Sequence, residues 1–167
     1  MKKFKNLKIK KQAGFNLIEV LLALLILSIG LLGVAGLQTT AVKASHTAML
    51  KSIAITKVSA MIERIRANPA VDINEYALEA GTVGISKGCD TRSDTILAAQ
   101  CSPEDLASND LYLWEKSLVN GGLPNTTDTD GSVVIDNAAT PPIATVTVFW
   151  KERGVSMSYF SKIQQLP

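Results

Sequence analysis

Residues Gly14 to Gln38, GFNLIEVLLALLILSIGLLGVAGLQ, decide the fold of this 167-residue chain. Between Leu17 and Leu37 the only charged residue is Glu19. As an α-helix with a rise of about 1.5 Å per residue, this run reaches roughly 30 Å, the thickness of a bilayer hydrocarbon core. A secretory signal peptide has a shorter apolar region and a small-residue cleavage site, which VAG at 34–36 matches poorly. We therefore predict a transmembrane helix over residues 17–37.

Glu19 is unusual in such a run. A carboxylate at the middle of a membrane-spanning helix costs about 2.5–3.5 kcal/mol, and less near an end, unless a cation is paired with it. Glu19 lies near the start of the apolar run. Two interpretations are open: the carboxylate reaches water among the lipid headgroups, or it meets a cationic partner.

Charge is unevenly distributed along the chain. Six lysines and no acids precede Gly14, whereas the remaining chain has 11 basic and 15 acidic residues. By the positive-inside rule, the lysine-rich end stays in the cytoplasm and the rest is exported. A basic tract of this kind can also bind nucleic acid or anionic lipid, but its place directly before an apolar helix favours a topology signal. The exported part is net negative and lacks a basic and aromatic cluster, so nucleic acid is not an expected partner.

The sequence GFNLIE at 14–19 resembles the processing site of type IV prepilins and type II secretion pseudopilins. In both, a short basic leader ends in glycine, and phenylalanine and then glutamate follow as the first and fifth residues of the mature chain. Asn16 departs from the family, in which serine or threonine is usual. The resemblance implies that a prepilin peptidase cleaves between Gly14 and Phe15 and methylates the amine of Phe15. It also implies that Glu19 attracts the amine of a neighbouring subunit during assembly.

Three later stretches are similar to the minor pilins called PilV: SIGLLGVAGLQ at 28–38, AVKASHTA at 41–48 and MIERIRANP at 61–69. This similarity implies a minor pilin that takes part in assembly or initiation of the type IV pilus and in pilus-dependent motility or adhesion. The implied partners are the prepilin peptidase, other minor pilins, the major pilin and inner-membrane lipid. The implied location is a single pass through the inner membrane with a periplasmic head, and then the cell-surface pilus.

Two other classes of protein share part of this pattern. A minor pseudopilin of type II secretion has the same processing site, but it shares the later stretches less obviously. A membrane-anchored periplasmic binding domain or enzyme would keep its N-terminal segment after export.

The N-terminal helix is predicted to cover residues 15–68, because the first proline after Gly14 is Pro69 and the residue before a proline is disfavoured in a helix. Its second half is amphipathic, with apolar residues at three- and four-residue spacing. These residues are Val42, Ile55, Val58, Met61, Ile62 and Ile65. The glycines at 30, 33 and 36 permit close packing, local unwinding or a break.

The rest of the chain predicts a small head. Residues 69–131 form a loop-rich region with short helices at 72–80 and 103–120, and residues 132–167 hold antiparallel strands. The strands are expected at 132–136, 143–152 and 155–163, with a hairpin turn at Glu152-Arg153-Gly154. A sheet laid against the helix would bury Val58, Ile62 and Ile65. The predicted fold is α+β, and a long helix on a small antiparallel-sheet head resembles type IV pilins.

Cys89 and Cys101 lie in a polar, turn-rich segment of the exported part. In an oxidising compartment they are expected to form a disulfide, which stabilises the fold by roughly 3 kcal/mol. A zinc site would need further ligands nearby, and the only histidine in the sequence is His46. His46 is also far in sequence from any candidate nucleophile, so neither a metal, nor a cofactor, nor catalysis is expected.

Overall fold

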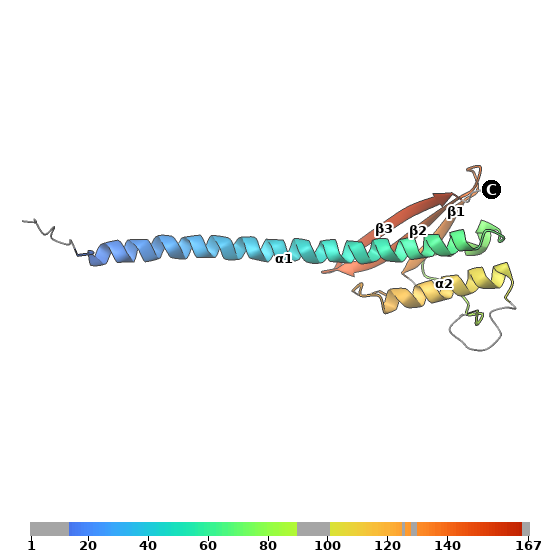
Figure 1. Cartoon of the computed structure of the whole chain (residues 1–167), viewed down its shortest axis with the longest axis horizontal. Coiled ribbons are helices and arrows are strands. Elements are labelled where there is room, and N and C mark those ends of the chain that lie inside the picture. The colour runs from blue at the N-terminus through green and yellow to red at the C-terminus, as the bar shows by residue number, and fades with distance from the viewer. Residues whose placement is uncertain (1–13, 90–100, 125, 128–129, 165–167) are drawn as a thin grey trace, which may run out of the picture. The chain divides into compact units, whose positions relative to one another are not determined.

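The computed structural model describes residues 14–89, 101–124, 126–127 and 130–164 (Figure 1). Along the chain the elements are a long helix α1, a short 3-10 helix η1, a helix α2 and three strands, β1 to β3. The chain divides into two compact units, with the boundary between Ala44 and Ser45. Helix α1 contributes to both units.

Helix α1 extends from Leu17 to Ala67 without interruption. The glycines at 30, 33 and 36 therefore lie within a continuous helix. Each end is one or two residues shorter than predicted. At the start, the carbonyl of Asn16 accepts hydrogen bonds from Glu19 N at 2.9 Å and Val20 N at 3.4 Å, so Asn16 is an N-cap and not part of the helix. At the end, Asn68 precedes Pro69, where helical backbone is disfavoured.

In the second unit the helix contributes a stem, residues 45–67, with one buried stripe. Its members recur at three- and four-residue spacing and include the predicted Val58, Ile62 and Ile65. The buried residues of the stem are Leu50, Ala54, Val58, Met61, Ile62 and Ile65. The prediction was wrong for Ile55 and Val42, which are both exposed. Ala54 takes the place expected of Ile55, and Val42 lies in the first unit, where every described residue is exposed.

The sheet is antiparallel with the order β1-β2-β3. Its strands are Gly131–Asp136, Ile143–Glu152 and Val155–Gln164, within one residue of the predicted bounds. Arg153 and Gly154 form the turn between β2 and β3, and both have positive φ, as a type I′ hairpin requires. In β2 the side chains alternate between the core and the outer face, with Val146, Val148 and Trp150 buried.

Helix α2, Pro103–Val119, completes the core. Ser102 caps it, because its Oγ accepts a hydrogen bond from Asp105 N at 3.2 Å, and Pro103 occupies the first turn. Trp114 is almost completely buried, and its Nε1 donates to the carbonyl of Lys57 in the stem at 2.8 Å. Stem, α2 and the inner face of the sheet thus enclose one apolar core.

The helix predicted at 72–80 is only a single 3-10 turn, η1, from Ile73 to Tyr76. Asp72 caps it, and the chain becomes extended at Ala77. Leu78 then forms a bridge with Val133 at the outer edge of β1, with N–H···O distances of 2.9 and 2.8 Å. If the helix continued to residue 80, Leu78 could not form its bridge with Val133. This tertiary contact therefore outweighs the local helical propensity of residues 72–80.

Residues 84–89 form a segment that we call the strap, because it lies along α2. Gly84 N donates to Oε2 of the buried Glu115 at 2.5 Å, and Lys87 N donates to Oδ1 of the buried Asn109 at 3.1 Å. A Cβ at Gly84 would lie 2.6 Å from the backbone nitrogen of Tyr112, so only glycine permits this close approach. Side chains of α2 therefore satisfy backbone donors of the strap, as a neighbouring strand would in a sheet.

Candidate processing and assembly site

The predicted processing residues lie together at the start of α1. Gly14, Phe15 and Asn16 precede the helix, and the backbone of Asn16 initiates it. Phe15 is 85% exposed, so the Gly14–Phe15 peptide bond adjoins an accessible side chain. An endopeptidase needs an extended and accessible bond of this kind, because a helical peptide bond cannot enter a substrate cleft.

Glu19 lies in the first turn of α1, where a negative charge interacts favourably with the helix dipole. It borders a shallow hollow that is otherwise lined by Phe15 and by apolar residues on the same helix face, namely Val20, Ala23, Leu24 and Leu27. Within the described part of the chain, Glu19 makes no ion pair. Among the described residues, the Glu19 carboxylate thus adjoins apolar surface and has no cationic partner.

From Leu17 to Leu37, the first unit presents an exposed and largely apolar surface. Leucine, isoleucine and valine side chains from Leu17 to Leu37 are all exposed. By length and composition α1 can cross a membrane, because its most apolar window has a mean hydropathy of 2.7 and none of that window is buried. An apolar surface of this extent requires lipid or another protein to cover it.

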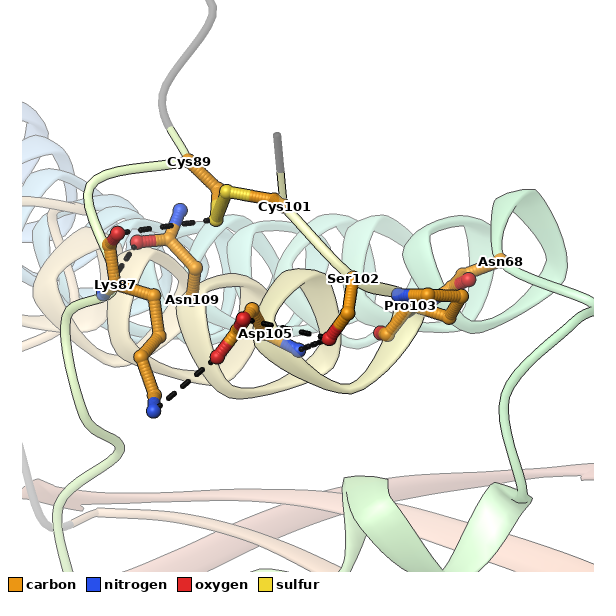
Figure 2. The surroundings of a disulfide bond; sticks show 8 residues. All are labelled: Asn68, Lys87, Cys89, Cys101, Ser102, Pro103, Asp105 and Asn109. Carbon is orange, nitrogen blue, oxygen red and sulfur yellow. Dashed lines mark hydrogen bonds and ion pairs between the residues drawn. A yellow bond between two sulfur atoms is a disulfide. The ribbon is translucent and has the colours of Figure 1, made fainter. Parts of the chain in front are cut away.

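The second predicted pair, Cys89 and Cys101, forms a disulfide with Cα atoms 6.1 Å apart (Figure 2). It joins the end of the strap to the residue before the N-cap of α2. Lys87 Nζ lies 3.2 Å from Asp105 Oδ1 beside it. The Lys87 side chain, through its hydrogen bond, holds the pKa of Asp105 below its usual value. The disulfide, the ion pair and the Lys87–Asn109 hydrogen bond fix this end of the strap to α2.

A polar cluster at the end of the stem was not predicted. Arg64 pairs with Asp110 of α2 at 2.5 Å, and the hydroxyl of Tyr76 lies 3.3 Å from Asp110 Oδ2. Asn68 donates to Tyr76 Oη at 3.3 Å and to the carbonyl of Pro103 at 2.7 Å. Burial raises the pKa of Tyr76 to about 12. These residues come from α1, the loop after it, η1 and α2, and no sequence spacing relates them.

A second unpredicted cluster lies where the β2–β3 hairpin meets the stem. Glu152 is buried, and its Oε1 accepts a hydrogen bond from Thr47 Oγ1 at 2.7 Å. His46 Nδ1 and Arg153 Nη2 lie 3.5 and 3.8 Å from the same oxygen. The Thr47 hydrogen bond, aided by His46 and Arg153, holds the pKa of Glu152 below its usual value. The alternation of core-facing and outward-facing residues along β2 could have predicted this cluster. It places Glu152 on the core face, where a charged side chain needs partners.

These two clusters join the stem to α2, to η1 and to the β2–β3 hairpin. No group of three or more His, Cys, Asp or Glu side chains that could hold a metal occurs in the part of the chain that the structure describes. His46 has Glu152 and Thr47 as neighbours, and both belong to the hairpin contact described above.

Comparison with protein families identifies two adjoining regions. Residues 9–35 match the prokaryotic N-terminal methylation motif, and residues 36–112 match the Tt1218-like family, described as type IV pilin Tt1218. Comparison with curated proteins and with solved structures gave no match. The two family matches support a place in the type IV pilin superfamily. The long apolar helix and three-stranded antiparallel head confirm the predicted α+β, type IV pilin-like fold.

Proposed function

We propose that this chain, in which a methylation motif adjoins a type IV pilin region, is a minor pilin of the PilV type. One observation carries the proposal. The methylation motif contains the accessible Gly14–Phe15 bond, Glu19 and most of an apolar helix that is fully exposed among the described residues. That helix is a membrane anchor before cleavage and a packing surface in a filament afterwards.

Glu19 has a role in the change from membrane anchor to filament subunit. Cleavage after Gly14 turns the nitrogen of Phe15 into an amine, which is cationic at neutral pH. A carboxylate on an apolar helix surface that enters a membrane or a filament core needs a cation, and within the described residues the monomer supplies none. The amine of a neighbouring subunit fills this need. Desolvated pairs of this kind contribute more to register than to stability, so the pair sets the position of one subunit against the next.

The head has a structural role in this proposal. Its residues form a disulfide-closed α+β unit, and its polar clusters connect stem, α2 and hairpin. The sequence stretches at 28–38, 41–48 and 61–69 favour the PilV type among pilins. The partners are then the prepilin peptidase, other minor pilins and the major pilin, and the chain takes part in pilus assembly or initiation without substrate turnover.

Mass spectrometry of the mature chain tests the processing step. We expect an N-terminus at methylated Phe15 in cells that contain the peptidase. A mature protein that retains residues 1–14 in those cells would contradict the proposal and would favour a membrane-anchored periplasmic domain.

Glu19→Ala tests the assembly step. Cleavage should stay nearly intact, because the variant keeps Gly14 and Phe15, while the amount of chain in sheared pili should fall to background. Glu63→Ala is the matched control, since Glu63 is an exposed acid on the same helix that pairs only with Arg66 among the described residues. Normal incorporation of the Glu19→Ala chain would refute the pairing. Deletion of the gene separates pilus from secretion pseudopilus, since loss of twitching indicates the first and loss of protein secretion the second.

A further inference from the structure

Within the described residues, strand β3 has one edge without a partner strand. It is the last strand of the sheet, and it pairs with β2 over ten residues in one continuous register. In a two-residue hairpin the residues that flank the turn form a hydrogen-bonded pair, so Val155 and every second residue after it point their N–H and C=O groups toward β2. The alternate residues point these groups away from the sheet. They are Ser156, Ser158, Phe160, Lys162 and Gln164, and all five are exposed.

The two edges of the sheet differ in whether another segment pairs with them. At β1, Leu78 forms a two-bond bridge with Val133 and so occupies part of that edge. At β3, within the described residues, no backbone group forms a hydrogen bond on the side away from β2. Soluble proteins usually blunt a long edge strand with a proline, a bulge or several charges. Strand β3 has neither proline nor bulge, and its only charged residue is Lys162.

We propose that an extended segment of a neighbouring pilin subunit, with acidic residues toward its ends, pairs with the free edge of β3 as a fourth strand. The inference rests on the proposed function, because the neighbour is a subunit of the same assembly. Five alternating residues offer ten backbone groups, enough for a partner strand of similar length. Phe160, 58% exposed on the outer face, gives that strand an apolar side chain to cover.

Charge selects the partner. Lys162 lies near one end of the edge and the exposed Lys151 flanks the hairpin end, while β3 contains no acid. Arg153 also lies at the hairpin end, but it faces Glu152 at 3.8 Å. Opposite charges across a strand pair are favourable and like charges are not. A second copy of β3 would bring another Lys162 and again no acid. The edge therefore fits a different, acid-bearing segment better than a second copy of itself.

Hydrogen exchange on the full chain tests the pairing directly. In detergent, amides of Ser158, Phe160 and Lys162 should exchange fast, while those of Tyr159 and Ser161 are protected by β2. In purified pili the first group should become at least about tenfold slower. Fast exchange of these amides in pili that contain the chain would overturn the inference and leave the proposed function standing. A chain absent from pili would overturn both. Protection already present in a detergent-soluble dimer would replace the acidic neighbour with a second copy.

Substitutions at the outer edge of β3 provide a second test of the pairing. Ser158→Pro removes an outward N–H and leaves the β2–β3 bonds in place, and edge strands tolerate such a proline. Ser158→Val keeps the N–H and is the control. Both should fold, form the disulfide and be cleaved, but the proline variant should be depleted in pili by about tenfold. Lys162→Glu should be depleted as well and Lys162→Arg should not. Equal incorporation of all four variants would overturn the proposal.

Discussion

Gly131, the first residue of β1, is a position where one added methyl group should lower stability for a reason that is purely steric. A Cβ there would lie 2.5 Å from Cζ3 and 2.8 Å from Cη2 of Trp114, and 3.1 Å from Cδ1 of Leu118. The indole has little freedom to move, because it is 1% exposed and its Nε1 is bonded to the carbonyl of Lys57. Gly131→Ala should therefore force the strand and the ring apart.

The magnitude follows from two opposing effects. Overpacking a well-filled core costs about 1–3 kcal/mol. Replacing a glycine by alanine, where the backbone permits it, stabilises by about 0.4–1 kcal/mol through the unfolded chain, and Gly131 does not have a positive φ. The net loss should be about 0.5–2 kcal/mol. For a unit of this size that lowers Tm by about 2–10 °C.

Thermal and urea unfolding of the full chain in detergent, followed by tryptophan fluorescence, measures this loss. Both tryptophans, Trp114 and Trp150, are in the second unit, so the signal reports on the head. The control is the Trp114→Phe background, which removes Cζ3 and Cη2. There Gly131→Ala should be neutral or stabilising. Equal destabilisation in both backgrounds, or an unchanged Tm in the wild-type background, would refute the steric argument.

Two further predictions concern titrating groups. Thr47→Val removes the main hydrogen bond that lowers the pKa of Glu152, so this pKa should rise toward its ordinary value of 4.5 in a carbon-detected NMR titration. The stabilisation from Glu152 is present above the unfolded-state pKa and lost as pH falls through the folded one, so the variant should lose less stability on acidification. An unmoved pKa would contradict this. For Tyr76, whose pKa is raised to about 12, stability should be full below pH 10.0 and fall as pH rises toward 12. Tyr76→Phe should abolish that alkaline loss while costing about 1–2 kcal/mol at neutral pH, measured by urea unfolding across pH; an unchanged alkaline slope would rule out Tyr76 as its source.

The elements with strong local signals could be predicted from the sequence. The observed bounds of β2 are the predicted ones, because alternation and the Arg153-Gly154 turn are both local. The start of α2 follows from its Ser-Pro cap. The predicted processing residues Gly14 and Phe15 and the predicted assembly residue Glu19 form a linear motif, so no knowledge of packing was needed to select them.

The features that could not be predicted from the sequence depend on contacts between distant parts of the chain. Alanine carries no periodic signal, yet Ala54, Ala107 and Ala144 are completely buried where the stem, α2 and the sheet approach one another. The preference for Ile55 over Ala54 followed from hydrophobicity alone. The edge bridge of Leu78 and the cluster around Tyr76 each join segments far apart in sequence, and no spacing rule anticipates them.

The strap has a consequence for how the surface of this protein can diverge. Helix α2 holds the start of the strap through the main-chain N–H of Gly84, and the side chain of the next residue, Ile85, is exposed. The other end of the strap is also held by the side chains of Lys87 and Cys89. Selection for stability therefore acts on Gly84, Glu115 and the residues at the disulfide end of the strap, and only weakly on the exposed Ile85. The residue at position 85 can therefore change during divergence while the contacts that hold the strap stay the same.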